Sequence, residues 1–478
     1  MLTLIFFILG FGILAIWLSN FNDKKLQQFS LLISSLVLIF SCIIIYQFDC
    51  NKMYFQNIVI YKIGSLGLNY NLYFGLDGIS IYFFFLSSLL IFLCILFIWD
   101  EKNFKLYALN LFLIEFFLLI IFSSLNIFVF YVFFEAILMP MFIIIGVWGS
   151  RARKIRAAYL FFFYTLCSSF LMLLSLTYIY ITVGTFDLEY IYSWTFSLKE
   201  QYFLWFSFFL SFASKIPMFP LHLWLPEAHV EAPTVGSVLL AGILLKLGVY
   251  GFLRFSLVLF PEASIYFSPL IFLFSILGVI YASLTAIRQT DIKRIIAYSS
   301  VAHMNIIVLG IFSFNIIGIE GAIIQSISHG FVAGGMFLLI GILYNRYHSR
   351  FLYYYGGLVH AMPLFATFFL TFTLANIALP TTSSFVGEFL LLTGIYYNNF
   401  YACFFSATGV ILCGAYSLWL ANRILFGNLK LEYTTIFLDL TKKEFVILIP
   451  LFLFILLIGI YPSFLSAYFS SSSYGLII

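Results

Sequence analysis

The segment ASKIPMFPLHLWLPEAH (residues 213–229) places a lysine, closely followed by Pro217 and Pro220, inside a long apolar stretch. It continues the run QYFLWFSFFLSF (residues 201–212), which has the composition of a membrane-spanning helix. Pro217 and Pro220 each lack the N–H that would bond to the carbonyl four residues earlier. We therefore expect a helix that opens beside Lys215, at a depth where hydrocarbon would otherwise surround the chain.

The composition of the whole chain is that of an integral membrane protein. Of its 478 residues, 64% are hydrophobic and only 9% are charged, whereas soluble domains carry about 25% charged residues. Only helices or closed barrels satisfy all backbone groups in lipid. The apolar runs last roughly 20 residues without the alternation of a barrel strand, so they predict helices. The six cysteines form no CxxC pair, so they indicate neither an iron–sulfur ligand set nor a disulfide framework.

The hydropathy pattern predicts an all-α polytopic membrane protein with about 14 transmembrane helices. Residues 47–75 form the longest early connection and predict a small β-hairpin or folded loop. The predicted segments are 2–19, 28–46, 76–98, 104–123, 126–147, 157–183, 202–225, 232–259, 266–288, 293–313, 318–344, 363–397, 400–425 and 444–469.

Positive charge predicts the orientation of the chain in the membrane. Lysines and arginines gather in the loops after odd-numbered segments, and one of these loops alone contains Arg151, Arg153, Lys154 and Arg156. The loops on the other side hold few, among which we count Arg254. Because positive loops remain on the cytoplasmic or matrix side, we expect both termini on the opposite side.

Several ionisable residues lie inside the predicted segments. Each charge at a helix centre costs about 2.5–3.5 kcal/mol, so five would cost roughly 12–18 kcal/mol together. That exceeds the net stability of an ordinary domain. Such residues persist where they are paired, hydrated or part of a proton or ion path. The charged residues concerned are Glu115, Glu135, Lys215, Lys246 and Glu388.

Lys215 stands next to the predicted helix break, and unwound backbone at this depth requires protein or a wet cavity around it. Broken helices near the membrane midplane are typical of transporters. Desolvation disfavours the charged form of a buried lysine, whereas a nearby carboxylate favours it, so such a lysine can accept and release a proton. The alternative is a lysine that extends to the membrane interface.

The twelfth segment contains a second break of the same kind. In NIALPTTSSFVGEFLLL (residues 376–392), Pro380 interrupts the run, hydroxyl side chains follow it, and Glu388 comes eight residues later. Serine and threonine hydroxyls can bond to the backbone groups that a proline frees. The two breaks lie five segments apart, and an odd offset inverts the topology of a repeat.

We therefore expect two inverted five-helix repeats, which divide the chain into four parts. Residues 104–260 form the first repeat and contain broken helix 7, and residues 261–426 form the second and contain broken helix 12. Residues 1–103 hold the first three helices and the hairpin, and residues 427–478 hold the last helix.

Further candidates have both a functional and a structural interpretation. Lys246 lies among glycines that permit close helix approach, and it is either part of the path or bonded to carbonyls. Glu135 is either a path residue or a structural partner. His303 and His329, with an ordinary pKa near 6.5, suit proton relay, although a helix histidine is more often a packing residue. Glu115 remains open between a helper on the path and a hydrogen-bonded core residue.

The turn between the seventh and eighth segments carries four more ionisable residues. We expect them at the surface, and metal binding there is the weaker alternative. They are His222, Glu227, His229 and Glu231.

Four long motifs resemble one family, the antiporter-like subunits of respiratory complex I, which are also related to multi-subunit sodium/proton antiporters. The resemblance covers almost the whole chain. The motifs are FFEAILMPMFIIIGVWG (residues 133–149), SKIPMFPLHLWLPEAHVEAPTVGSVLLAGILLKLG (214–248), DIKRIIAYSSVAHMN (291–305) and ISHGFVAGGMFLLIGILY (327–344).

The resemblance implies roles for these residues. Glu135 and Lys215 would be the glutamate–lysine pair of a first half-channel. Lys246 would be the central lysine, linked through two histidines, His303 and His329, to the second half-channel. Glu388 would end that half-channel. A related type of antiporter-like subunit has lysine at this position, so the glutamate indicates the M-type branch. Glu115 matches no family motif.

The resemblance also implies a function and a location. The chain would be a proton-translocating membrane-arm subunit that couples NADH-to-ubiquinone electron transfer to proton pumping in the mitochondrial inner membrane, or in a bacterial plasma membrane. It would contain no cofactor; NADH, FMN, iron–sulfur clusters and ubiquinone would belong to other subunits. Its partners would be neighbouring antiporter-like subunits and the lipid bilayer, not nucleic acid. The alternatives are a subunit of a sodium/proton antiporter and a purely structural arm subunit.

Overall fold

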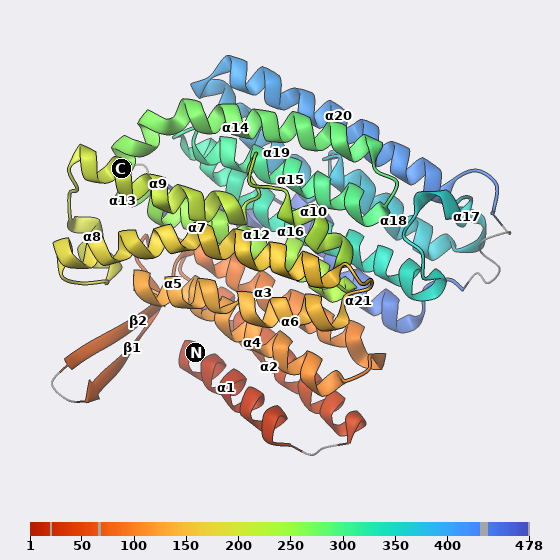
Figure 1. Ribbon diagram of the computed structural model, residues 1–478, viewed down its shortest axis with the longest axis horizontal. Coiled ribbons are helices and arrows are strands. Elements are labelled where there is room, and N and C mark those ends of the chain that lie inside the picture. Colours follow the sequence, from red (N-terminus) through yellow and green to blue (C-terminus); the bar gives the residue numbers. More distant parts are fainter. Residues whose placement is uncertain (20–21, 66–67, 431–437, 477–478) are drawn as a thin grey trace.

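The computed structural model describes residues 1–19, 22–65, 68–430 and 438–476. Helices lie side by side along the long axis of the molecule, and a two-stranded antiparallel hairpin projects at one end (Figure 1). The strands are β1 (Gln56–Ser65) and β2 (Leu68–Leu76). The helical class and the hairpin at residues 47–75 are therefore confirmed.

The helices follow the predicted segments closely. The first half contains α1 (Leu2–Leu18), α2 (Asp23–Gln47), α3 (Gly78–Phe97), α4 (Phe104–Ser123), α5 (Ile127–Ala136), α6 (Leu138–Trp148), α7 (Lys154–Val183), α8 (Leu188–Ser193), α9 (Leu198–Lys215), α10 (Trp224–Glu231), α11 (Thr234–Leu239), α12 (Leu245–Gly251) and α13 (Leu257–Leu259). The second half contains α14 (Pro261–Arg288), α15 (Ile292–Ile311), α16 (Ile316–Tyr347), α17 (Leu358–Ala361), α18 (Pro363–Asn376), α19 (Ser383–Asn398), α20 (Phe400–Leu425), α21 (Lys442–Ile460) and α22 (Ser463–Tyr474).

Eleven helices in the described part of the chain are long and apolar enough to cross a membrane. The other three predicted segments correspond to α1, to the interrupted pair α9 and α10, and to the interrupted pair α18 and α19. Most of these helices are shorter, and the 18 residues of α9 include three charged ones, so the count of 14 stays a prediction.

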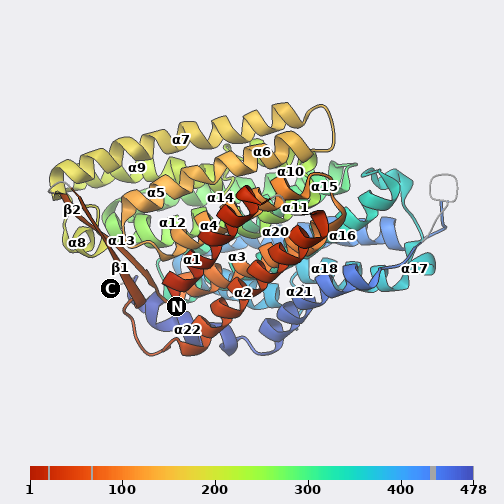
Figure 2. The same cartoon turned by 90° about the horizontal axis from the view of Figure 1, so that it is seen from below.

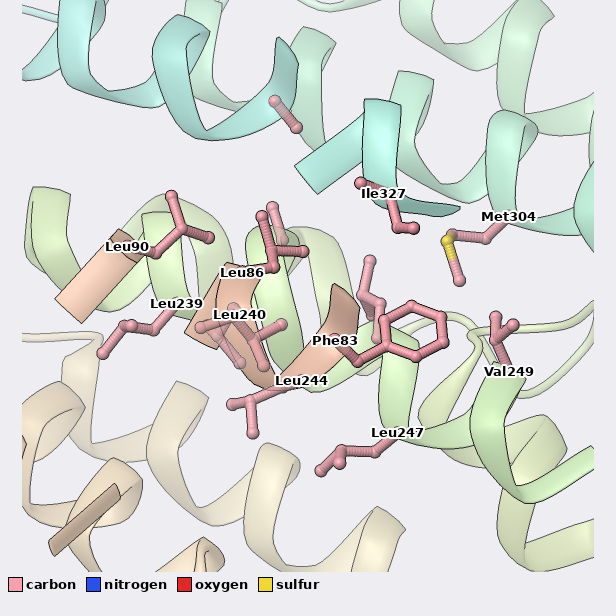
Figure 3. Packing of buried hydrophobic residues seen from close by; sticks show 14 of the residues in the cluster. Phe83, Leu86, Leu90, Leu239, Leu240, Leu244, Leu247, Val249, Met304 and Ile327 are labelled. Carbon is pink, nitrogen blue, oxygen red and sulfur yellow. The ribbon is translucent and has the colours of Figure 1, made fainter. Parts of the chain in front are cut away.

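The core surrounds one helical segment, residues 234–259, whose α-helical turns alternate with two π-helical turns. These are η2 (Leu240–Leu244) and η3 (Phe252–Ser256). Figure 3 shows leucines of this segment packed against Leu86 of α3 and Ile327 of α16. The segment is completely buried within the chain, so any polar group on it must find its partner inside the protein.

The chain breaks beside Lys215, as the two prolines predict. α9 ends at this lysine, and turns lead to α10. One prediction from Pro217 is wrong: the carbonyl of Ala213 is not free, because the N–H of Met218 donates to it at 3.0 Å. The indole of Trp224 donates to the carbonyl of Ser214 at 2.8 Å. The break is therefore a closed, internally bonded turn.

The second break separates α18 from α19. The hydroxyl of Ser384 donates to the carbonyl of Ala375, and the hydroxyl of Thr382 donates to that of Leu379 at 2.7 Å. Hydroxyl side chains thus bond to backbone carbonyls around this break, although both carbonyls also accept a backbone N–H, from Ala378 and Thr382 respectively. Ser383, by contrast, makes no hydrogen bond through its buried hydroxyl.

The two ends of the helices differ in charge. The hairpin, α8 and both chain termini lie toward one end, and α17 and the connection from α6 to α7 lie toward the other (Figure 2). We call the second the basic end, because it carries the loop with Arg151, Arg153 and Lys154. The prediction that Arg254 lies in a loop is wrong. Arg254 lies in η3 and is buried, and its guanidinium contacts the Asp77 carboxylate at 2.6 Å.

Candidate functional site

Lys246 lies at the centre of the molecule, immediately after the π-helical turn η2. It is fully buried. Its ammonium donates to the carbonyl of Ala241, five residues earlier, and its Nζ lies 2.8 Å from Nδ1 of His329. π-helical turns widen a helix locally and are frequent at functional sites. The geometry combines both interpretations of this lysine: it bonds to a carbonyl, and it contacts a histidine on another helix.

No carboxylate of the described residues lies within 4.0 Å of the Lys246 ammonium. Its two partners are a neutral carbonyl and an imidazole, and Leu86 and Leu90 of α3 lie beside the same helix in Figure 3. A permanent charge in such surroundings would be costly. A lysine that exchanges its proton with the neighbouring imidazole avoids part of this cost.

Two histidines extend the path from Lys246. The rings of His329 on α16 and His303 on α15 have centroids 5.8 Å apart. Nδ1 of His303 lies 2.9 Å from Oε1 of Glu388 on α19, although the oxygen lies off the N–H direction and forms no aligned hydrogen bond. The same oxygen accepts a hydrogen bond of 3.1 Å from the amide of Gln325. The structure thus places four predicted residues, Lys246, His329, His303 and Glu388, in one buried series.

No pattern in the sequence predicts the partners on the other side of His303. Its Nε2 lies 3.7 Å from the thiol of Cys413 on α20, and the hydroxyl of Tyr416 donates to this sulfur at 3.0 Å. The thiol in turn contacts the carbonyl of Asn376 at 3.3 Å, which Pro380 leaves without its usual helical partner. Cys413 is ten residues from the other cysteine of this helix, Cys403, and forms no motif with it, so only a three-dimensional arrangement could identify it.

Glu135 and Lys215 form a second group. Glu135 lies in the last turn of α5, beside the interruption between α5 and α6, and Lys215 ends α9. The two charges are close enough to act on each other electrostatically, but they form no ion pair within 4.0 Å. The Lys215 ammonium lies instead over the ring of Phe134, 4.5 Å from its centroid, a favourable cation–π position.

Glycines bring the Lys215 helix against the Lys246 helix. A Cβ atom on Gly248 would lie 2.4 Å from Ile216 and 2.9 Å from the carbonyl of Phe212. A Cβ atom on Gly251 would lie 2.4 Å from the Phe212 ring. The close approach predicted from these glycines is therefore confirmed. Phe212 lies at this contact. No hydrogen bond between described side chains joins the Glu135–Lys215 group to the group that begins at Lys246.

Glu115 stands apart from both groups. It is fully buried on α4, and neither carboxylate oxygen has a hydrogen-bond partner. No hydrogen bond joins Glu115 to either group, so both interpretations of this residue stay predictions.

The prediction that the turn after Lys215 lies at the surface is wrong for three of its four ionisable residues. His222, His229 and Glu231 are buried, because α10 packs between α7 and α15. The ring of His229 stacks on Phe337 with centroids 4.8 Å apart. Glu227 forms a half-exposed ion pair of 2.8 Å with Arg294. Among the described residues, no three potential metal ligands gather.

A cavity of about 200 Å³ lies at the basic end; we call it the Lys293 cavity. Its lining includes Glu101, Thr234 and Lys293, whose ammonium donates to the carbonyl of Ala232 at 2.9 Å. Partial burial and the neighbouring Asp100 raise the pKa of Glu101, which lies just outside the membrane-spanning helix. Polar groups of both signs therefore face a space large enough for several water molecules.

Comparison with known proteins identifies the class to which this fold and this series of buried groups belong. Residues 124–413 match the model of the transmembrane family described as NADH:quinone oxidoreductase/Mrp antiporter. The match covers more than half of the chain, so the chain belongs to this family.

Individual relatives are similar over almost their full length. NADH-ubiquinone oxidoreductase chain 4 of Chondrus crispus is 52% identical over 456 residues, which cover 94% of this chain and 92% of the relative. Chain 4 of Arabidopsis thaliana is 48% identical over 453 residues, with 94% and 91% covered.

Solved structures share the fold. A chain of respiratory complex I from Thermus thermophilus with bound NADH superposes with a TM-score of 0.89 at 29% identity, over 100% of both chains. A chain of an archaeal membrane-bound sulfane sulfur reductase gives a TM-score of 0.86 at 20% identity, over 96% of this chain and 76% of that one. The second likeness concerns the fold alone.

Proposed function

We propose that this chain is a proton-translocating membrane-arm subunit of respiratory complex I in the mitochondrial inner membrane. The chain is a subunit of the NADH:ubiquinone oxidoreductase. The chain itself carries no redox centre. NADH, FMN, iron–sulfur clusters and ubiquinone belong to other subunits, and other antiporter-like subunits are its neighbours. The names of the algal and plant relatives support this assignment.

The observation that carries the proposal is the buried series Lys246–His329–His303–Glu388. All four groups can hold a proton. Lys246 lies 2.8 Å from His329, the ring of His329 is adjacent to that of His303, and His303 lies 2.9 Å from Glu388. Buried ionisable groups in membrane proteins mark proton and ion paths. A purely structural role would require ion pairs between helices, whereas Lys246 has no carboxylate partner in the described part of the chain.

The Glu135–Lys215 pair supplies the control of proton loading. The pair is open in this structure, since the ammonium lies over Phe134. A closed pair at about 4 Å would interact by roughly 4 kcal/mol at an effective dielectric constant of 20. Relative to full separation of the two charges, that corresponds to about a thousandfold difference in the proton affinity of Lys215. Protons enter from the basic end, pass Lys215 and Lys246, and leave through Glu388.

The Lys293 cavity supports entry from the basic end, because it opens there and has a polar lining. The proposal includes two inverted repeats, residues 104–260 and 261–426. Each contains a helix that breaks at proline, beside Lys215 in the first and ahead of Glu388 in the second.

Glu388→Gln in the assembled complex of a tractable relative tests this proposal, with the exposed Glu262→Gln as the matched control. We expect normal assembly, lost proton pumping and lowered NADH–ubiquinone turnover for the first variant and no change for the second. Normal assembly with both activities intact would reduce Glu388 to a structural residue. Transport that depends on sodium rather than on NADH oxidation would favour the antiporter alternative.

A further inference from the structure

We propose that the phosphate of an anionic phospholipid binds in a cavity at the basic end, with one acyl chain along α7. The cavity has a volume of about 360 Å³, and we call it the Arg151 cavity. Arg151, His348 and Ser349 supply polar groups, and none of the residues that line it is acidic. Its other lining residues are aromatic: Tyr347, Phe351, Tyr354 and Tyr355.

The charge in this region is not balanced within the described part of the chain. Arg151 is exposed and has no carboxylate within 4.0 Å; its guanidinium lies 5.3 Å from the centre of the Phe351 ring. The carboxylates of Asp291 and Glu231 face the buried guanidinium of Arg350 at 3.8 Å each. Arg151 and Arg350 are close enough to repel each other. A bound anion beside Arg151 would offset this repulsion.

Phosphate is the anion that fits these groups best. A guanidinium presents parallel N–H donors that match phosphate oxygens in a bidentate arrangement. The His348 ring is exposed at the same cavity and can supply another N–H. Basic pockets between transmembrane helices on the cytoplasmic or matrix side are recurrent sites for phospholipid headgroups.

An exposed apolar stripe favours a lipid over free phosphate as the source of the anion. Ile155, Tyr159 and Phe163 point outward from α7, with 58%, 48% and 54% of their surface exposed. They lie four residues apart and thus on one helix face, and the rings of Tyr159 and Phe163 stack at 5.9 Å. Arg151, which lines the cavity, lies in the turn just before α7 begins at Lys154. The stripe therefore starts in the first turn of the helix that follows Arg151, where it can lead an acyl chain from the headgroup level into the hydrocarbon.

The test measures the phospholipid retained by the detergent-purified, assembled complex, by native mass spectrometry after exposure to vesicles of phosphatidylglycerol or phosphatidylcholine. We compare the unchanged chain with Arg151→Gln, Arg151→Lys and Arg153→Gln. Arg153 is the matched control, because it carries the same charge in the same loop but does not line the cavity.

We expect Arg151→Gln to lose about one phosphatidylglycerol per complex, Arg151→Lys to keep most of it, and Arg153→Gln to retain it fully. Equal retention in all four proteins, or equal loss in Arg151→Gln and Arg153→Gln, would overturn the site. Displacement of the lipid by inorganic phosphate alone, or equal binding of phosphatidylcholine, would overturn the proposed ligand. Failed assembly of both Arg151 variants with unchanged lipid in the residual complex would assign the cavity to a protein interface instead.

Discussion

Nζ of Lys246 and Nδ1 of His329 lie 2.8 Å apart, which connects the helix with π-helical turns to α16 at the centre of the molecule. Because each residue is the other's partner, their substitutions should not act independently. We expect Lys246→Met and His329→Ala each to reduce proton pumping by at least about tenfold, since positioned proton-transfer groups contribute ~100-fold or more. The double variant should be little worse than either single variant. Proton-pumping rates of the four assembled complexes provide the cycle.

Leu247→Met is the matched control, because Leu247 is the buried neighbour of Lys246 and has no polar group to lose. It should pump at the normal rate. Fully additive losses in the cycle would show that the lysine and the histidine serve different paths.

Cys413 provides a second prediction, because its sulfur accepts the hydrogen bond of the buried Tyr416 hydroxyl and lies beside His303. Cys413→Val would leave this hydroxyl without its acceptor, which costs about 1–3 kcal/mol. Cys413→Ser would keep an acceptor in place. We expect thermal denaturation of the assembled complex to show a lower midpoint for valine and a nearly unchanged one for serine. Equal midpoints would mean that the thiol has no role in positioning Tyr416.

The sequence predicts the elements of this fold well, because each membrane crossing has its own local signal. Long apolar runs specify the helices, Pro217 and Pro380 specify the two breaks, and rare charges identify Lys246 and Glu388. None of these signals depends on a distant part of the chain.

The sequence does not reveal which residues meet across helices. His229 lies in a stretch whose polar composition predicts a turn at the surface, yet α10 packs inward and buries it against Phe337. Cys413 becomes a neighbour of His303 only through the packing of α20. The π-helical turns next to Lys246 also leave no mark in the pattern of apolar residues, because every side of this helix is buried.

Gly248 provides a prediction about the contact between the Lys215 and Lys246 helices. A Cβ atom here would come within 2.9 Å of the Phe212 carbonyl, and this backbone atom cannot turn away as a side chain does. We expect Gly248→Ala to lower the free energy of unfolding by about 1–3 kcal/mol, as overpacking does. Gly146→Ala is the control, because nothing lies within 4 Å of its Cβ position. Thermal stability of the assembled complex compares the two, and equal midpoints would contradict a tight contact at Gly248.

The last prediction concerns the buried ion pair between Arg254 and Asp77, which contact each other at 2.6 Å. Arg254→Met should destabilise the protein by about 3–5 kcal/mol, because it leaves a buried carboxylate without its partner. Asp77 also accepts a hydrogen bond of 3.0 Å from the N–H of Ser80 at the start of α3, so its replacement must keep a helix cap. The double variant Arg254→Met with Asp77→Ser meets this requirement and removes both charges. We expect the double variant to recover most of the lost stability, measured as the denaturation midpoint of the assembled complex. A double variant less stable than Arg254→Met would contradict a role limited to charge pairing.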